Sequence, residues 1–525
     1  MEEEPMATQK GVDTPDTALV KPEEKSSQGL TRGRVIGLVL GPLLALLVYL
    51  VMPEMALPLG DGETEEVMSV NGAVVAAVTV WIAIWWATEA LPIPVTSLLP
   101  LVLFPLMVEG AEVGDVASAY GSDTIFLFMG GFMLALAMQK WNLHKRIALT
   151  IVSKVGSNTV GLVGGFMIAT GFITMWVSNT ATAVMMLPVG LSVVALIAQF
   201  RGGRTDANFA TALMLGIAYS SSIGSVATLI GTPPNVLMVG YLADTHDIQI
   251  GFGQWMMAGV PLAAVFMLIA WFVLTRLFKP GVKKVEGAQE LIREELTKMG
   301  AMSRGEKLVL AVFAFAALSW IFIPMIADLG PVAAVAPWLG NVTDAGVAMT
   351  VAVLLFLLPV DRKTPLMDWE TAVKLPWGVL LLFGGGLAIS AQFTDSGLSA
   401  WVGAQVSFLS GVPTWVLILA VSALVLFLTE LTSNTATAAT FLPIMGGVAM
   451  GMDIDVLALV VPVALAATMA FMLPVATPPN AIAFGSGYVK IGEMIKGGVW
   501  LNLVALFLIL GTMYGLMTWA LGISL

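Results

Sequence analysis

The chain has 525 residues, of which 58% are hydrophobic and only 11% are charged. Soluble domains carry roughly 25% charged residues, so the composition excludes a protein that is surrounded by water. The net charge of −11 indicates little about partners, because much of it lies in polar tails and loops. The chain contains no cysteine, and His144 and His246 fall in polar connecting segments. The sequence therefore predicts neither a thiolate site nor a His-rich metal site.

Apolar runs recur along the whole sequence, and many reach the length of about 20 residues that crosses a bilayer as a helix. The short alternating segments that are typical of a transmembrane barrel do not occur in the sequence. We therefore expect an all-α polytopic membrane protein.

In chain order, residues 1–33 are polar and acidic and predict a disordered cytoplasmic tail. This tail is too long and too acidic for the start of a signal peptide, so the apolar run 35–52 is predicted to be a retained first helix. Further helices are predicted near 70–88, 92–107, 122–140, 208–243, 252–278, 305–327, 343–360, 376–392, 456–489 and 495–523. Two longer apolar segments span 159–200 and 411–451.

The basic residues predict the orientation of these helices, because Lys and Arg gather in cytoplasmic loops. Arg32 and Arg34 precede the first helix, so the N-terminus is expected in the cytoplasm. Lys and Arg also place both ends of segment 159–200 on the cytoplasmic side. Two full spans with an outside turn would satisfy these charges, and so would a re-entrant hairpin.

Three sequence motifs occur twice in the same order. SNTAT starts at Ser178 and again at Ser433, LFMGGFMLALAMQ from Leu127 matches LLFGGGLAISAQF from Leu381, and IGTPPNVLMVG from Ile230 matches VATPPNAIAFG from Val475. Five predicted spans separate the two long segments, and this odd number makes the second segment enter from the opposite face. The pattern predicts an inverted-topology repeat, which is typical of secondary transporters.

The repeated motifs predict helix breaks at the centre of the protein. Short polar side chains in SNT compete for backbone hydrogen bonds, and the two prolines of Thr-Pro-Pro-Asn stop a helix. Segments 159–200, 207–243 and 456–489 contain no Asp, Glu, Lys or Arg, and 411–451 contains only Glu430. A proton-coupled carrier typically buries more ionisable groups, so the sequence favours sodium, which Asn and Thr oxygens can bind. Glu430 corresponds to Met175 in the first repeat, and its role stays open. The Gly130-Gly131 and Gly384 to Gly386 clusters favour close helix packing over ligand binding.

At these motifs the sequence resembles the divalent anion/sodium symporter family, the sodium-coupled dicarboxylate, citrate and sulfate carriers. The resemblance covers nearly all of residues 34–525. It implies about 11 transmembrane helices plus two re-entrant hairpins, a homodimer, and an elevator-type movement of a transport domain against a scaffold. It divides the chain into N-terminal scaffold helices (34–121), a first repeat core (122–251) with hairpin 159–200 and broken helix 208–243, scaffold helices (252–375) with a basic loop (276–307), and a second repeat core (376–525) with hairpin 411–451 and broken helix 456–489.

The resemblance also implies the site residues. The first sodium site would use Thr174, Ser178, Asn179 and Gly231, and the second would use Thr429, Thr432, Asn434 and Ala476. The substrate carboxylates would contact Asn179, Thr180, Thr232, Asn434, Thr435 and Thr477.

The sequence thus predicts a sodium-coupled importer of small dianions, with C4-dicarboxylates such as succinate, malate and fumarate as the first choice, in the plasma (inner) membrane of a bacterium. Sodium is the expected coupling ion, with no other cofactor and no nucleic acid partner. Sulfate or citrate symport and sodium-independent dicarboxylate exchange are alternatives within this class. A channel is an alternative outside it. A membrane enzyme is disfavoured, because it would need a nucleophile with a base or a metal cluster.

Overall fold

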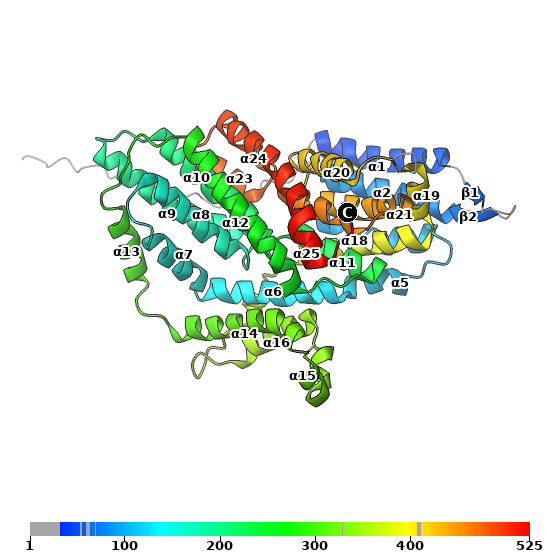
Figure 1. Ribbon diagram of the computed structural model, residues 1–525, viewed down its shortest axis with the longest axis horizontal. Helices are drawn as coiled ribbons and strands as arrows, with labels where there is room; N and C mark the ends of the chain where they lie inside the picture. Colours follow the sequence, from blue (N-terminus) through cyan, green and yellow to red (C-terminus); the bar gives the residue numbers. More distant parts are fainter. Residues whose placement is uncertain (1–31, 53–54, 59–63, 69, 328, 407–410) are drawn as a thin grey trace, which may run out of the picture.

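The structure is a computed structural model that describes residues 32–52, 55–58, 64–68, 70–327, 329–406 and 411–525 (Figure 1). The predicted tail 1–33 lies outside the described residues except for its last two. The described part is almost entirely helical, as the composition predicts. The exception is an antiparallel pair of strands, β1 (Met55–Pro58) and β2 (Thr64–Met68), in the connection between the first two helices. The hydropathy pattern did not predict this hairpin, because it detects long apolar runs and not short strands.

Eight helices in the described part of the chain are long and apolar enough to cross a membrane. They span Gly33–Val51, Val70–Thr88, Val113–Lys140, Asn179–Gln199, Phe252–Leu277, Arg304–Ala327, Trp377–Asp395 and Ile491–Leu521. Shorter apolar helices lie among them, for example Thr159–Thr174 and Thr414–Thr429. The count of about 11 spans therefore stays a prediction.

The first part of the chain forms α1 (Arg32–Val51), α2 (Val70–Thr88), α3 (Ile93–Thr96), α4 (Pro100–Met107), α5 (Val113–Ser118), a 3₁₀ turn (Ala119–Gly121), α6 (Asp123–Lys140) and α7 (Leu143–Ser153). The helix predicted over 92–107 is present as an apolar helical element, Ile93–Met107, but prolines at its start and middle divide it into α3 and α4. Helix α7 was not predicted, since it is short and amphipathic. His144 lies in α7, so its placement in a polar connecting segment was also wrong: it is buried, with Nδ1 3.0 Å from the Met138 carbonyl oxygen. His246 is likewise helical, as the last residue of α11 (Pro233–His246).

The first long segment forms two helices, α8 (Thr159–Thr174) and α9 (Asn179–Phe200), which are joined through the SNT motif. The predicted helix 208–243 is interrupted as well: α10 (Ala207–Ser225) ends before residues 226–232, and α11 follows. Helix α12 (Phe252–Leu277) then leads to the connector between the two halves.

The connector contains α13 (Ala288–Lys298), a charged helix as the sequence predicts. It is followed by α14 (Arg304–Ala327), α15 (Gly330–Val335), a 3₁₀ segment (Pro337–Asn341), α16 (Asp344–Leu357), α17 (Trp369–Ala372) and α18 (Trp377–Asp395). Helices α14 and α16 pack against each other and against α6, and lie along one side of the molecule (Figure 1).

The second half repeats the pattern of the first. After α19 (Leu398–Val406), the second long segment forms α20 (Thr414–Thr429) and α21 (Asn434–Gly451) around its own SNT motif. Helices α22 (Leu457–Thr468) and α23 (Pro478–Gly485) are separated by residues 469–477. The chain ends with α24 (Ile491–Thr512), a π-helical turn (Met513–Met517) and α25 (Thr518–Leu521).

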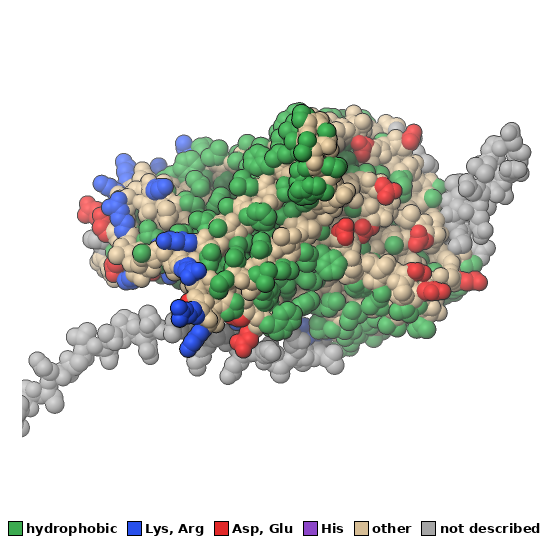
Figure 2. Space-filling model, turned by 90° about the horizontal axis from the view of Figure 1, so that it is seen from below, with side chains coloured by type: hydrophobic (Ala, Val, Ile, Leu, Met, Phe, Trp, Pro, Cys, Tyr) green, Lys and Arg blue, Asp and Glu red, His purple; other side chains and the backbone are tan. Residues whose placement is uncertain are grey.

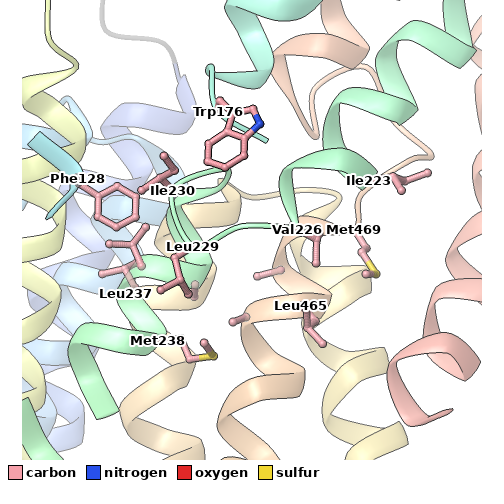
Figure 3. Packing of buried hydrophobic residues seen from close by; sticks show 14 of the residues in the cluster. Phe128, Trp176, Ile223, Val226, Leu229, Ile230, Leu237, Met238, Leu465 and Met469 are labelled. Carbon is pink, nitrogen blue, oxygen red and sulfur yellow. The ribbon is translucent and has the colours of Figure 1, made fainter. Parts of the chain in front are cut away.

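The two halves interlock around the breaks. Helix α8 packs on α10 and α20 packs on α22, while α9 contacts α23 and α21 contacts α11. Figure 3 shows Trp176 from the first SNT connection above Val226 and Ile230 of one break, with Met469 of the other break nearby. Because lipid gives no hydrophobic drive for helix association, close packing at small residues holds such helices together. A Cβ added at Gly224 would lie 2.3 Å from the Gly171 carbonyl oxygen.

The glycine clusters are packing positions, as predicted. A Cβ at Gly130 would lie 2.4 Å from the Ala348 carbonyl oxygen of α16, and one at Gly385 would lie 2.6 Å from the Ser97 carbonyl oxygen.

Charge is distributed unevenly along the long axis. Figure 2 shows Lys and Arg gathered toward the end where α9 and α13 lie in Figure 1, and mainly Asp and Glu toward the end with β1 and β2. Between these ends, hydrophobic side chains and uncharged groups make up most of the surface in this view. This arrangement fits the loop charges from which the orientation was predicted.

Candidate functional site

The first candidate sodium position is built from the two sides of the α8–α9 connection. Thr174, the last residue of α8, is fully buried, and its Oγ1 donates to Asn179 Oδ1 at 2.7 Å and to the Ser221 carbonyl oxygen at 3.0 Å. Asn179 is the first residue of α9, and its Nδ2 lies 3.4 Å from Ser225 Oγ. Three oxygen atoms from two helix ends and one break-flanking helix therefore converge at this point.

The second candidate position repeats this geometry. Thr429 Oγ1 donates to Asn434 Oδ1 at 2.8 Å and to the Ala467 carbonyl oxygen at 3.1 Å. Thr429 ends α20, Asn434 starts α21, and Ala467 is in the last turn of α22. The threonine, the asparagine and a backbone carbonyl thus form the same constellation in both halves. The two carbonyls were missed from the sequence, because a backbone oxygen carries no sequence signal.

The remaining predicted sodium ligands are less uniform. Gly231 lies in the first break and packs against the end of α10, where an added Cβ would lie 2.1 Å from the Ser225 carbonyl oxygen, so the position has no room for a side chain. Ala476, its counterpart, is buried and does carry a methyl group. Ser178 is exposed, and its Oγ accepts from the Ala181 amide at 3.3 Å as the N-cap of α9. Thr432 Oγ1 bonds the Leu428 carbonyl at 2.9 Å and Thr437 Oγ1 at 2.7 Å, so it faces its own hairpin.

The predicted substrate residues lie at four helix starts. Thr180 and Thr435 are in the first turns of α9 and α21, while Thr232 and Thr477 are the N-caps of α11 and α23. One of these residues contacts the other half of the chain: Thr232 Oγ1 lies 3.3 Å from Thr468 Oγ1 at the end of α22. Each helix start offers partial positive charge, which favours an anion in segments that contain no Lys or Arg.

Two asparagines that were not predicted as site residues hold the breaks open. Asn235 Nδ2 donates to the carbonyl oxygens of Thr228 at 3.0 Å and Val226 at 3.4 Å. Asn480 Nδ2 donates to the carbonyl oxygens of Ala470 and Leu473, both at 3.1 Å. Both side chains are fully buried, so each amide replaces hydrogen bonds that the helix loses where it unwinds. The signal was present in the sequence, since both residues end the duplicated Thr-Pro-Pro-Asn motif.

The first SNT connection packs against side chains of α12 and α14. The Trp176 ring stacks on Phe252 of α12 with centroids 6.0 Å apart, and meets Phe313 of α14 edge-on at 4.8 Å. Trp176 and Val177 are both buried. Non-helical backbone is tolerated within a membrane only in such surroundings or beside a wet cavity.

Glu430 binds the free backbone amides of the second break. Its carboxylate accepts from the backbone amides of Phe471, Met472 and Leu473 at 2.8 to 3.1 Å, and from Asn502 Nδ2 of α24 at 2.7 Å. The side chain is 3% exposed. The sequence marked Glu430 as exceptional but could not identify these partners.

Known proteins are similar to this chain in sequence or in fold. The sodium-dependent dicarboxylate transporter SdcS of Staphylococcus saprophyticus is 42% identical over 510 residues, which are 95% of this chain and 95% of that protein. SdcS of Staphylococcus aureus (strain USA300) is 41% identical over 511 residues, covering 96% of this chain and 95% of that protein. The solved structure of Neisseria gonorrhoeae MtrF has a TM-score of 0.54 at 13% identity, covering 94% of this chain and 95% of that chain, which shows a shared fold.

A family model described as the sodium:sulfate symporter transmembrane region matches residues 40–523. This match and the SdcS relatives confirm the family that the duplicated motifs indicated. The chain belongs to the sodium:sulfate symporter family.

Proposed function

We propose that this protein is a sodium-coupled symporter of small dianions, with C4-dicarboxylates such as succinate, malate and fumarate as substrates, in a bacterial plasma membrane. The observation that carries the proposal is the duplicated constellation of a buried threonine, an asparagine and a backbone carbonyl. The SdcS relatives, which are named as sodium-dependent dicarboxylate transporters, favour dicarboxylate over the sulfate in the family description.

Each constellation suits a sodium ion. Hard cations prefer oxygen ligands, and carbonyl, amide and hydroxyl oxygens are all available here. The Thr174 hydroxyl now donates to two acceptors, Asn179 Oδ1 and the Ser221 carbonyl. A sodium ion among these atoms would take the place of that shared proton, with the hydroxyl rotating to present its lone pair. Thr429, Asn434 and Ala467 would do the same in the second half.

The dianion would bind between the two constellations. Asn179 and Asn434 would each use Oδ1 for sodium and Nδ2 for a substrate carboxylate, while the hydroxyls of Thr180, Thr232, Thr435 and Thr477 donate from the helix starts. Sodium beside the carboxylates would neutralise charge that no lysine or arginine in these segments can offset. Tight dianion binding would therefore require sodium, which is the basis of coupling.

The first arms of the two hairpins are shorter than a full span, which supports re-entrant hairpins, whereas the second arm of the first hairpin, α9, has 22 residues and is long enough to cross. Helices α8 and α20 each have 16 residues, which corresponds to about 24 Å of rise. The hydrocarbon core is about 30 Å thick, so each helix would end inside the membrane, close to the buried Trp176 in the first case. We further propose that the two halves form an inverted repeat, that the N-terminus is cytoplasmic, and that a homodimeric scaffold supports elevator-type movement of the hairpins and broken helices.

Uptake of labelled succinate into proteoliposomes tests the function. We expect uptake with an inward sodium gradient, and none when choline replaces sodium. The variants Asn179→Ala and Asn434→Ala should each reduce uptake at least tenfold, about the loss of 1.4 kcal/mol of binding or transition-state stabilisation. Ser157→Ala, outside both constellations, is the matched control for loss of a polar side chain. Sodium-independent exchange of internal for external succinate would favour the exchanger instead.

A further inference from the structure

In the second break, Glu430 accepts hydrogen bonds from backbone amides that would have carbonyl acceptors in a continuous helix. Helix α22 ends at Thr468 and α23 begins at Pro478, so the amides between them lose their helical acceptors. The Glu430 carboxylate accepts hydrogen bonds from three of these amides, those of residues 471 to 473. Asn502 of α24 adds a fourth donor.

In the first break, the corresponding hydrogen bonds involve only neutral groups. Met175 occupies the position equivalent to Glu430, and its backbone carbonyl accepts from Thr228 Oγ1 at 2.5 Å. Trp255 Nε1 of α12 donates to the Val226 carbonyl at 3.0 Å. The two halves therefore share the threonine–asparagine–carbonyl constellation but differ by one buried negative charge.

This charge lies beside the second constellation. Glu430 follows Thr429 in the chain, and both side chains contact the end of α22 or the break after it. No Lys, Arg or His within the described residues forms an ion pair with Glu430. Charge-assisted bonds from neutral donors hold the carboxylate in place, but they leave its negative charge unbalanced.

We propose that Glu430 is the positioning residue and fixed counter-charge of the second sodium site, so that this site binds sodium more tightly than the first. The inference rests on the proposed function, because it needs sodium at Thr429, Asn434 and Ala467. The carboxylate fixes the break through its backbone amides and attracts the cation through its charge. The first constellation has the same ligands without this attraction.

The test measures sodium binding without transport. The full-length protein is purified in detergent, and its thermal unfolding midpoint is followed against sodium concentration, with choline keeping the ionic strength constant. For Glu430→Gln we expect the sodium concentration for half-maximal stabilisation to rise about tenfold or more, because the substitution removes the negative charge of the residue next to Thr429 in a medium of intermediate dielectric. Glu370→Gln makes the same chemical change at an exposed site and should leave the sodium dependence unchanged.

Asn502→Ala separates charge from structure. It removes one donor but keeps the carboxylate, so we expect a lower midpoint without sodium and an undiminished or stronger response to sodium. A purely structural role predicts instead that Glu430→Gln, like Asn502→Ala, lowers the midpoint without shifting the sodium dependence, and that result for Glu430→Gln would overturn the inference. If Glu430→Gln does not fold, a weakened sodium response in Asn502→Ala overturns it equally. A wild-type protein that sodium does not stabilise would contradict the proposed function itself.

Discussion

Replacing Asn480 by alanine should destabilise the protein through one identifiable carbonyl. The Asn480 amide donates to the Ala470 and Leu473 carbonyl oxygens, both at 3.1 Å. The Leu473 carbonyl also accepts from the Ala476 amide at 3.3 Å, so it keeps a donor after the substitution. The Ala470 carbonyl has no second donor among the hydrogen bonds described outside the helices, and Asn480 is fully buried.

The magnitude follows from these contacts. A buried carbonyl left without a donor costs about 1–3 kcal/mol, and losing the second hydrogen bond costs roughly 1 kcal/mol more. We therefore expect a loss of about 2–4 kcal/mol in the free energy of unfolding. The unfolding equilibrium constant should change by a factor of about 30 to several hundred.

Asn235→Ala should have a similar effect for a parallel reason. Its loss leaves the Thr228 carbonyl without the amide at 3.0 Å, while the Val226 carbonyl retains Trp255 Nε1. Unfolding by sodium dodecyl sulfate in mixed micelles, followed by tryptophan fluorescence, measures both variants. Asn341→Ala, at an exposed position, is the control and should change stability by less than about 0.5 kcal/mol. If Asn480→Ala is as stable as this control, the amide does not hold the break and the reasoning is refuted.

Two further predictions concern pH and topology. Burial holds the pKa of His144 below its usual value, against the opposing hydrogen bond to Met138, so stability should be complete above about pH 6.5 and decline as the pH falls toward the lowered pKa. His144→Asn, which keeps a donor for the Met138 carbonyl, should reduce the difference between unfolding midpoints at pH 7.5 and 5.5; an unchanged difference would contradict this. Because the native chain has no cysteine, single thiols report topology: an impermeant maleimide added outside intact cells should label Gly411→Cys and not Arg204→Cys. At Ala181→Cys, sodium with succinate should slow labelling, whereas fast labelling that ignores both solutes would mean that α8 and α9 form two ordinary spans.

The interruptions of the helices could be predicted from the sequence, because residues close together in the chain produce them. Prolines 233 and 478 start helices in the structure, and both SNT motifs separate two helices. The pairing of Thr174 with Asn179, five residues apart, is also local. Such features depend on backbone donors and short polar side chains, which the sequence shows directly.

The long-range hydrogen bonds at these interruptions could not be predicted in the same way. Asn502 reaches Glu430 from 72 residues away, and Trp255 of α12 reaches Val226 from 29 residues away. Helices that are apolar on all sides carry little periodicity, so hydropathy does not show which face packs on which neighbour. The amphipathic α7 and the β1–β2 hairpin were missed because a search for membrane spans detects only long apolar runs, and these elements are too short or too polar.

The charge composition of the central segments gives a physical reason for coupling under the proposed function. A dianion that entered alone would meet neutral donors, helix starts that each offer about half a positive charge, and the fixed carboxylate of Glu430. Removing a charge from water costs several kcal/mol unless it is paired. A lysine in the site would pair the dianion whether or not sodium were present, and would therefore abolish the dependence on sodium. With asparagine and threonine in its place, the positive charge must arrive as a mobile ion, so the affinity for the dianion rises only when sodium has bound.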